Sequence, residues 1–228
     1  MDIENFKVSN EWKQTYPNAS VGVMIITNTT NRSSHPDLDM KMEEIESEIR
    51  NNHSQSGRDG IRALPTIQAY TAYYKKFKKT YHVQLQLESI ALKNRNLPRI
   101  STLVSAMFAA ELKNQLLTAG HDLSKLKSPL VLDVSKGEES YTGMGGKVNN
   151  LSINDMFISD NEGIISSIIY GPDNRTSITK DTSDVIFTVY GPEGISSEQI
   201  YDHFQDICSL VKIASPNETN SSIKIFEA

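Results

Sequence analysis

Hydroxyl side chains gather in one Gly-Pro-containing stretch of the sequence, and hydroxyls in such a turn can bind a small polar ligand. The stretch, residues 171–182, reads GPDNRTSITKDT and contains Thr176, Ser177, Thr179 and Thr182. One interpretation is that these hydroxyls hydrogen-bond an amino-acid-sized ligand. The other is that they cap their own backbone, because Ser and Thr hydroxyls bond nearby main-chain groups in turns. The pattern favours neither interpretation.

A second group of candidate residues is basic. It consists of Lys75, Lys76, Lys78 and Lys79, followed later in the chain by Lys93, Arg95 and Arg99. These cations suit an RNA backbone, and Tyr73 and Tyr81 could stack on bases beside them. The solvated face of an amphipathic helix explains the same residues and is the commoner case.

The usual signatures of hydrolases and metal sites are missing from the sequence. There is no Gly-x-Ser-x-Gly elbow, and the histidines lack metal-ligand spacing, so we expect neither a metal nor a cofactor. His203 and Cys208 are five residues apart on one predicted helix and face different directions. We therefore expect a surface histidine and a core cysteine. Glu138 and Glu139 follow a glycine and are expected to stabilise a turn.

The glycine-rich run at residues 143–146 (GMGG) does not fit a phosphate-binding loop. Such a loop needs a helix directly after it, whereas VNNLS follows here. We expect a hairpin or an irregular loop, because Gly and Asn dominate turns.

Composition places the chain among ordinary globular proteins. It has 228 residues, of which 38% are hydrophobic and 22% charged, enough to bury a sizeable core. The net charge of −5 argues against a dedicated nucleic-acid binder, although it is compatible with a local basic patch. A single cysteine excludes an intrachain disulfide. The first residues do not resemble a leader, and no apolar run approaches ~18 residues, so we expect a cytoplasmic protein without a membrane span.

Hydrophobic periodicity predicts helices in the first half of the chain. Residues 21–27 (VGVMIIT) are suited to a buried strand. An acidic helix then begins at Pro36, and a polar loop covers residues 51–64. Three further helices are predicted at residues 65–77, 83–91 and 103–120.

The second half of the chain predicts mainly strands. They are expected at residues 130–134, 156–159, 164–170 and 185–190, with an edge strand at 222–227. Ser196 and Gln199 form a capping box before a final helix. A helix-rich half followed by a strand-rich half indicates the α+β class, with helices packed on a mixed or antiparallel sheet. We expect residues 1–228 to form one domain.

The order of motifs from Asn94 to Thr182 resembles the B3/B4 domain of the phenylalanyl-tRNA synthetase β subunit. Leu97-Pro98 leads into an apolar helix, and a Gly-x-Asp-Leu-x-x-Leu turn follows at residues 120–126. A strand ending in Gly137-Glu138, an Asp-ended strand and a Thr-x-x-Thr turn complete the series. The chain more closely resembles the free-standing proteins built from that domain alone. The resemblance implies the α+β fold of this domain.

In the synthetase, this domain is an editing module that holds the mischarged tyrosyl end of a tRNA while water hydrolyses the ester. The resemblance places the Thr-Asn pair of that pocket at Met107 and Phe108, its histidine at Ala119 and its tyrosine-reading glutamate at Thr188. The family's Gly-Gly turn corresponds to Gly171-Pro172. Each replacement removes a polar contact, so the resemblance implies a retained scaffold with a changed pocket.

Three hypotheses follow from the resemblance. The first is that the protein deacylates a different mischarged tRNA in trans, using a site formed by Thr176, Ser177, Thr179, Thr188 and Asp160. The RNA would contact Lys75, Lys76, Lys78, Lys79 and Arg95. The second is a non-catalytic module for an amino-acid-like ligand or an RNA end. The third is a protein partner, such as a synthetase, bound to the acidic helix through Glu43, Glu46 and Glu48.

Overall fold

Two β-sheets pack face to face in this computed structural model, which describes residues 3–216 and 220–228. The first sheet has the order β1-β4-β7-β8-β9 and is mixed, because β1 runs parallel to β4 while the other pairs are antiparallel. Its strands are β1 (Phe6–Val8), β4 (Leu130–Val134), β7 (Met156–Asp160), β8 (Gly163–Ser167) and β9 (Gly171–Pro172).

The second sheet is antiparallel and has the order β11-β2-β10-β3. Its strands are β11 (Asn220–Glu227), β2 (Ser20–Thr27), β10 (Val185–Gly191) and β3 (Thr118–Asp122). A separate hairpin of β5 (Ser140–Thr142) and β6 (Val148–Asn150) contains the glycine-rich run at its turn, as predicted. The two sheets meet through contacts such as the stacked rings of Phe6 and Phe226, whose centroids are 4.8 Å apart.

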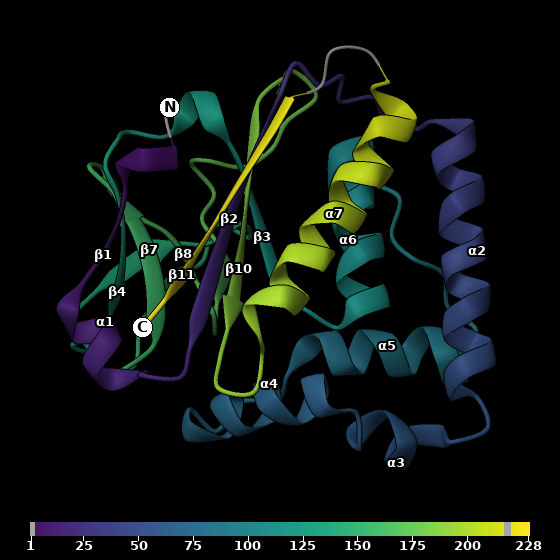
Figure 1. Ribbon diagram of the computed structural model, residues 1–228, viewed down its shortest axis with the longest axis horizontal. Helices are drawn as coiled ribbons and strands as arrows, with labels where there is room; N and C mark the ends of the chain where they lie inside the picture. Colours follow the sequence, from purple (N-terminus) through teal and green to yellow (C-terminus); the bar gives the residue numbers. More distant parts are fainter. Residues whose placement is uncertain (1–2, 217–219) are drawn as a thin grey trace.

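Helices cover the other face of the second sheet and one end of both sheets (Figure 1). Within the described residues the helices are α1 (Asn10–Thr15), α2 (Pro36–His53), α3 (Gly57–Arg62), α4 (Pro65–Lys76), α5 (His82–Lys93), α6 (Thr102–Asn114) and α7 (Ser197–Ala214). α7 packs on β2 and β11, with α6 and α2 beyond it, while α3, α4 and α5 lie along the lower end in Figure 1. The α+β class predicted from the sequence is confirmed.

β2 shows why a continuous apolar run predicts a strand buried on both faces. Gly22 faces α7, where an added Cβ would lie 2.3 Å from Ile200 and 2.6 Å from Phe204. The strand lies between the other sheet and α7, so neither of its faces reaches water. The capping box at Ser196 and Gln199 is also confirmed, and it begins α7 as predicted.

The prediction of a loop at residues 51–64 is wrong. α2 continues to His53, and residues 57–62 form the short helix α3. Ile61 is fully buried, and Arg58 forms a 3.0 Å ion pair with Glu88 of α5. These tertiary contacts stabilise a helix whose glycines would otherwise favour a loop.

The helix predicted to reach Gly120 ends earlier. α6 stops at Asn114, because Gln115 adopts the left-handed conformation with φ of 55°. The chain then enters β3, which pairs with β10, and Asp122 ends this strand instead of following a helix. The strand predicted at residues 164–170 is also shorter than expected and ends at Ser167.

His203 is buried, so the prediction of a surface histidine is wrong. Its Nε2 lies 2.7 Å from the Thr118 hydroxyl, and Asn114 lies 3.1 Å from its Nδ1. These bonds join α7 to the end of α6 and the start of β3. Cys208 is buried in the core, as predicted.

Candidate ligand-binding site

A cavity of about 560 Å³ lies between α5, α6, β3 and the segments around β8 and β9. This volume is in the range that holds a small organic ligand. The wall is mainly apolar, with few polar side chains. The residues that line it are His82, Gln86, Ile100, Val104, Met107, Phe108, Glu111, Leu117, Thr118, Ala119, Gly120, Met144, Ser167, Ile169, Tyr170, Gly171, Pro172, Ser177, Ile178 and Tyr190.

One face of α6 forms a wall of the cavity. Val104, Met107, Phe108 and Glu111 follow the i, i+3, i+4, i+7 spacing that places side chains on a single helix face. The lining also includes Ala119 of β3, whose side chain ends at Cβ and leaves space open. The spacing of α6 and the small residue on β3 together account for an apolar hollow between them.

Glu111 is the acidic residue among those that line the cavity. Its side chain is 2% exposed, and its Oε2 accepts a 2.8 Å hydrogen bond from the backbone N–H of Thr118. Burial raises the pKa of this carboxyl to about 8. A carboxyl with such a pKa gains or loses its proton near neutral pH, which is typical of functional sites in clefts.

A second buried carboxyl lies behind the cavity wall. Asp155 is fully buried and accepts a 3.1 Å hydrogen bond from the Tyr73 hydroxyl at Oδ1, while its Oδ2 has no partner in the described part of the chain. Burial raises its pKa to about 7. Ser167, which lines the cavity, is among the neighbours that partly oppose this rise in pKa.

Buried tyrosines of α4 connect the walls of the cavity to the helix beneath them. Tyr70 donates a 2.7 Å hydrogen bond to the Tyr190 carbonyl and accepts one from the Leu117 amide. Tyr74 donates to the Ile168 carbonyl at 2.7 Å. Each hydroxyl bonds to the main chain beside a lining residue, so α4 holds the cavity in a defined shape.

The structure separates the five hydroxyl and carboxyl residues predicted to bind the substrate. Ser177 lines the cavity, and its hydroxyl donates to the Asn174 carbonyl at 3.0 Å. Thr188 is fully buried on β10 opposite Ala119, and Asp160 accepts hydrogen bonds from Arg175 at 2.8 and 3.1 Å. Neither Thr188 nor Asp160 lines the cavity.

The threonines of the predicted turn bond within the protein. Thr176 is fully buried and donates its hydroxyl hydrogen to Asp173, so His121 Nδ1 donates to the Thr176 oxygen at 2.7 Å. Thr182 donates to Asp122 at 2.7 Å and accepts from the Thr179 amide at 2.9 Å. These contacts match the backbone-capping interpretation of the turn and show how Asp122 fixes it.

The Gly-Glu-Glu turn is structural, as predicted. The Glu139 carboxylate accepts hydrogen bonds from the Ser135 hydroxyl and from the amides of Lys136, Gly137 and Glu138. Burial alone would raise the pKa of this carboxyl. The hydrogen bonds have the larger effect and lower the pKa to about 2.

The basic residues are divided between two places. Lys75, Lys76, Lys78 and Lys79 lie at the end of α4 and in the turn that follows, whereas Arg95 lies beyond the far end of α5. The Lys76 amino group is 5.1 Å from the centre of the Tyr16 ring, and that of Lys79 is 5.5 Å from the centre of the Tyr170 ring.

Two details of the sequence-based interpretation of charged and aromatic residues are wrong. Tyr73 and Tyr81 are buried, at 2% and 0% exposure, and cannot stack on bases. Glu46 is also buried, where Arg99 and the Leu97 amide bond it at 3.0 and 2.9 Å. It therefore cannot belong to an acidic contact face.

Sequence reasoning missed Glu111 as a candidate. It was hidden within an apolar helix, although its spacing from Val104, Met107 and Phe108 was a usable signal. Among the residues with described positions, no three His, Cys, Asp or Glu side chains form a group that could hold a metal ion. No helix in the described ranges is long and apolar enough to span a bilayer.

Comparison with known proteins gives a family match and matches to solved structures. The model of the B3/4 domain family matches residues 66–204, which is more than half of the chain. The fold is similar to an N-terminal fragment of the phenylalanyl-tRNA synthetase β subunit from Pyrococcus horikoshii, with a TM-score of 0.50 and 12% identity. That match covers 95% of this chain and 49% of the fragment, so the chain spans about half of the fragment's length. No curated protein matches the chain.

Proposed function

The chain belongs to the B3/4 domain family, and we propose that its cavity binds the aminoacyl group of a mischarged tRNA and promotes its hydrolysis in trans. One observation carries this proposal. Met107, Phe108 and Ala119, which the family resemblance equates with polar residues of the editing pocket, all line the cavity that contains Glu111. A cavity at the positions that the resemblance equates with the family pocket, with a different lining, supports the proposal.

The lining favours an amino acid with an apolar side chain. Val104, Met107, Phe108 and Ile178 present hydrocarbon to the cavity. The position expected to recognise a tyrosine hydroxyl is Thr188, which is buried away from the cavity. A pocket that discriminates by a polar contact needs that contact to be present. We therefore expect a substrate other than tyrosyl-tRNA.

Glu111 is suited to bind the ammonium group of the amino acid. A cation beside a buried carboxyl favours its ionised form and lowers its pKa. Because burial raises the pKa of this carboxyl to about 8, ligand binding at pH 7 should release protons. Calorimetric titration with a non-hydrolysable amide analogue, repeated in buffers of different ionisation enthalpy, measures this release.

The reaction itself needs no covalent intermediate. The oxygen of a water molecule bonds to the ester carbonyl carbon, the bond from that carbon to the terminal ribose oxygen breaks, and the ribose oxygen takes a proton. The products are the free amino acid and the uncharged tRNA. Ser167 and Ser177 line the cavity, and we propose their hydroxyls as the candidates to orient this water.

A deacylation screen tests the proposal. The purified protein is presented with tRNAs carrying correct and incorrect amino acids, beside Glu111→Gln and the exposed control Glu138→Gln. We expect one apolar mischarged tRNA to be hydrolysed above background, with a loss of at least about tenfold for Glu111→Gln and no change for Glu138→Gln. A folded protein without hydrolysis on any substrate would refute the enzymatic proposal.

The apolar replacements also favour a second candidate function, which is ligand binding without catalysis. Three polar residues of the family pocket correspond to Met107, Phe108 and Ala119, so groups that could activate water are fewer. A binding module is stabilised by the amide analogue without turning over the ester. The expected stabilisation is about 2.7 kcal/mol at a ligand concentration of 100 Kd.

A further inference from the structure

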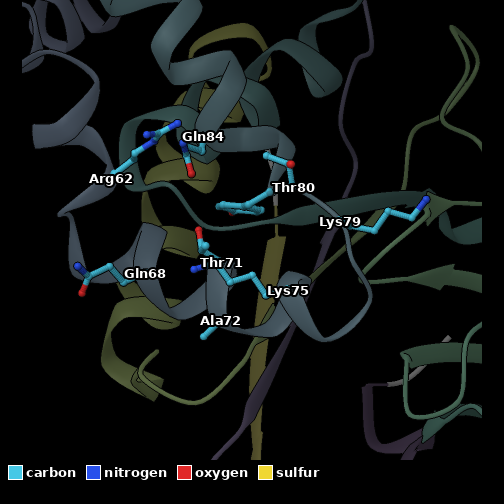
Figure 2. A pocket seen from close by; sticks show the side chains of 9 residues that line it. Arg62, Gln68, Thr71, Ala72, Lys75, Lys79, Thr80 and Gln84 are labelled. Carbon is cyan, nitrogen blue, oxygen red and sulfur yellow. The ribbon is translucent and has the colours of Figure 1, made fainter.

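A second hollow lies between the end of α3, the outer face of α4 and the start of α5. Its volume is about 690 Å³, and polar or cationic side chains surround it, namely Arg62, Gln68, Thr71, Lys75, Thr80 and Gln84. Figure 2 shows Arg62 and Gln84 together on one side, with Thr71 and Lys75 on the other. The Lys79 side chain also lines the hollow but extends away from these residues.

The hollow has cations without carboxylate partners. Among the described residues, no ion pair joins an acidic side chain to Arg62 or Lys75. Glu88, one turn beyond Gln84 on α5, is already bound by Arg58 at 3.0 Å and by Gln84 at 2.8 Å. Two unpaired cations on facing sides of one hollow create a site for an anion.

Uncharged hydrogen-bond donors also favour an anion in the hollow. The Thr71 hydroxyl oxygen is buried and has no hydrogen-bond partner in the described part of the protein. Thr80 precedes α5 and Gln84 lies in its first turn, and the N-terminus of this helix has no side-chain cap. The unpaired amides of such a turn favour a negative group. The carboxyl end of α4 disfavours a negative group, and the charge of Lys75 offsets this effect.

The hollow and the ligand-binding cavity lie on either side of residues 79–82. Thr80 and Tyr81 line the hollow, whereas His82 lines the cavity. Lys79 joins the two, because its stem lines the hollow and its amino group is 5.5 Å from the centre of the Tyr170 ring at the cavity. A chain molecule could therefore occupy both places at once.

We propose that the hollow binds a phosphate group of an RNA strand, through Arg62 and Lys75, while the end of that strand enters the cavity. The choice of RNA as the source of the phosphate rests on the proposed function. The binding of a phosphate needs no hydrolysis, so it is tested separately with uncharged tRNA.

The experiment measures tRNA affinity by fluorescence anisotropy at several salt concentrations for the full chain. Wild type is compared with Arg62→Gln, Lys75→Gln and the control Lys212→Gln. Lys212 is exposed in the last turn of α7, at the opposite end of the fold from α4 in Figure 1. Thermal melts confirm that all variants fold, and inorganic phosphate serves as a second probe.

We expect Arg62→Gln and Lys75→Gln to weaken binding by roughly three- to tenfold, and to lower the salt slope by about 0.7 for each phosphate that is no longer neutralised. Lys212→Gln should match wild type. Equal affinity and slope in all four proteins would overturn the proposal, even if deacylation is found. Stabilisation by inorganic phosphate without tRNA binding would overturn the RNA assignment. Weaker tRNA binding with a lower salt slope in both variants would support the proposal, even if no ester is hydrolysed.

Discussion

The Glu111 carboxyl accepts a hydrogen bond from the backbone amide of Thr118 at 2.8 Å, and this contact joins two walls of the cavity. Glu111 lies in the last turn of α6, and Thr118 begins β3. The acidic group that faces the cavity is therefore held in place by the main chain. Its position does not depend on a second side chain.

Glu111 should make the protein less stable as the pH rises. Its pKa is raised from 4.5 to about 8, so the folded state holds the proton more tightly than the unfolded state. The free energy of unfolding should fall between these two pH values and level off above pH 8. Glu111→Gln, which keeps an acceptor for Thr118, should gain on the order of 2–4 kcal/mol relative to wild type by pH 8. Urea unfolding across pH 4–9 measures this, and parallel pH profiles would contradict it.

His203 should have the opposite effect at acid pH. Burial lowers its pKa from 6.5 to about 3, so the unfolded chain binds a proton that the folded chain excludes. The stability it contributes is complete above pH 6.5 and is lost as the pH falls towards 3. His203→Gln should reduce this acid sensitivity by on the order of 2–4 kcal/mol, measured by unfolding at pH 4 and pH 7. An unchanged difference between the two pH values would show that His203 is not responsible.

Replacement of Glu46 should destabilise the protein, whatever its effect on partners. It is 2% exposed and joins α2 to Arg99 and to the Leu97 amide. Glu46→Ala leaves these groups unpaired and should cost about 2–4 kcal/mol in urea unfolding. Glu43→Ala, at an exposed position of the same helix, should change stability by less than about 0.5 kcal/mol. Similar losses at both positions would be inconsistent with this account.

Thr188 and Thr182 should respond in opposite ways to the same chemical change. The Thr188 hydroxyl is buried without a partner in the described residues, so Thr188→Val should stabilise the fold by about 1 kcal/mol. The Thr182 hydroxyl bonds both Asp122 and the Thr179 amide, so Thr182→Val should destabilise it by about 1–3 kcal/mol. Thermal unfolding measures both, and a loss at Thr188 would point to a partner such as a bound water.

A larger side chain in the cavity should block the ligand without unfolding the protein. Val104 is half-buried on the cavity wall, so Val104→Phe fills space that a ligand would use. It should abolish stabilisation by the amide analogue and change the melting temperature by no more than a few degrees, because overpacking is relieved towards the cavity. Leu92→Phe, at an exposed position on α5, is the control and should keep ligand stabilisation. Retained stabilisation in Val104→Phe would place the ligand elsewhere.

Periodicity predicted the elements that bury a regular stripe or both faces. β2, α2 and α7 are such elements, and all three were predicted. α3 and β3 were missed for a physical reason. The two glycines of α3 disfavour a helix, and TAGHD has no strand alternation, so contacts with α5 and β10 decide their structure.

The candidate site was predicted less completely than the fold. The family resemblance led to Met107, Phe108 and Ala119, which line the cavity. The hydroxyl-rich turn was a poorer guide to the cavity, because the Thr176 hydroxyl bonds Asp173 and His121 within the protein. Glu111 becomes apparent only when α6 is seen facing β3, since its spacing indicates a shared face but not an open space beside it.

β11 lies at the edge of the second sheet and covers one edge of β2. β11 pairs along the whole length of β2 and occupies the hydrogen-bonding groups of the most apolar strand. Without residues 220–228, β2 would become an edge strand that could pair with another molecule, the usual first step of sheet-to-sheet aggregation. β11 bears serines and Lys224, and residues of this kind resist such pairing. We therefore expect β11 to limit self-association through β2 as well as to complete the sheet.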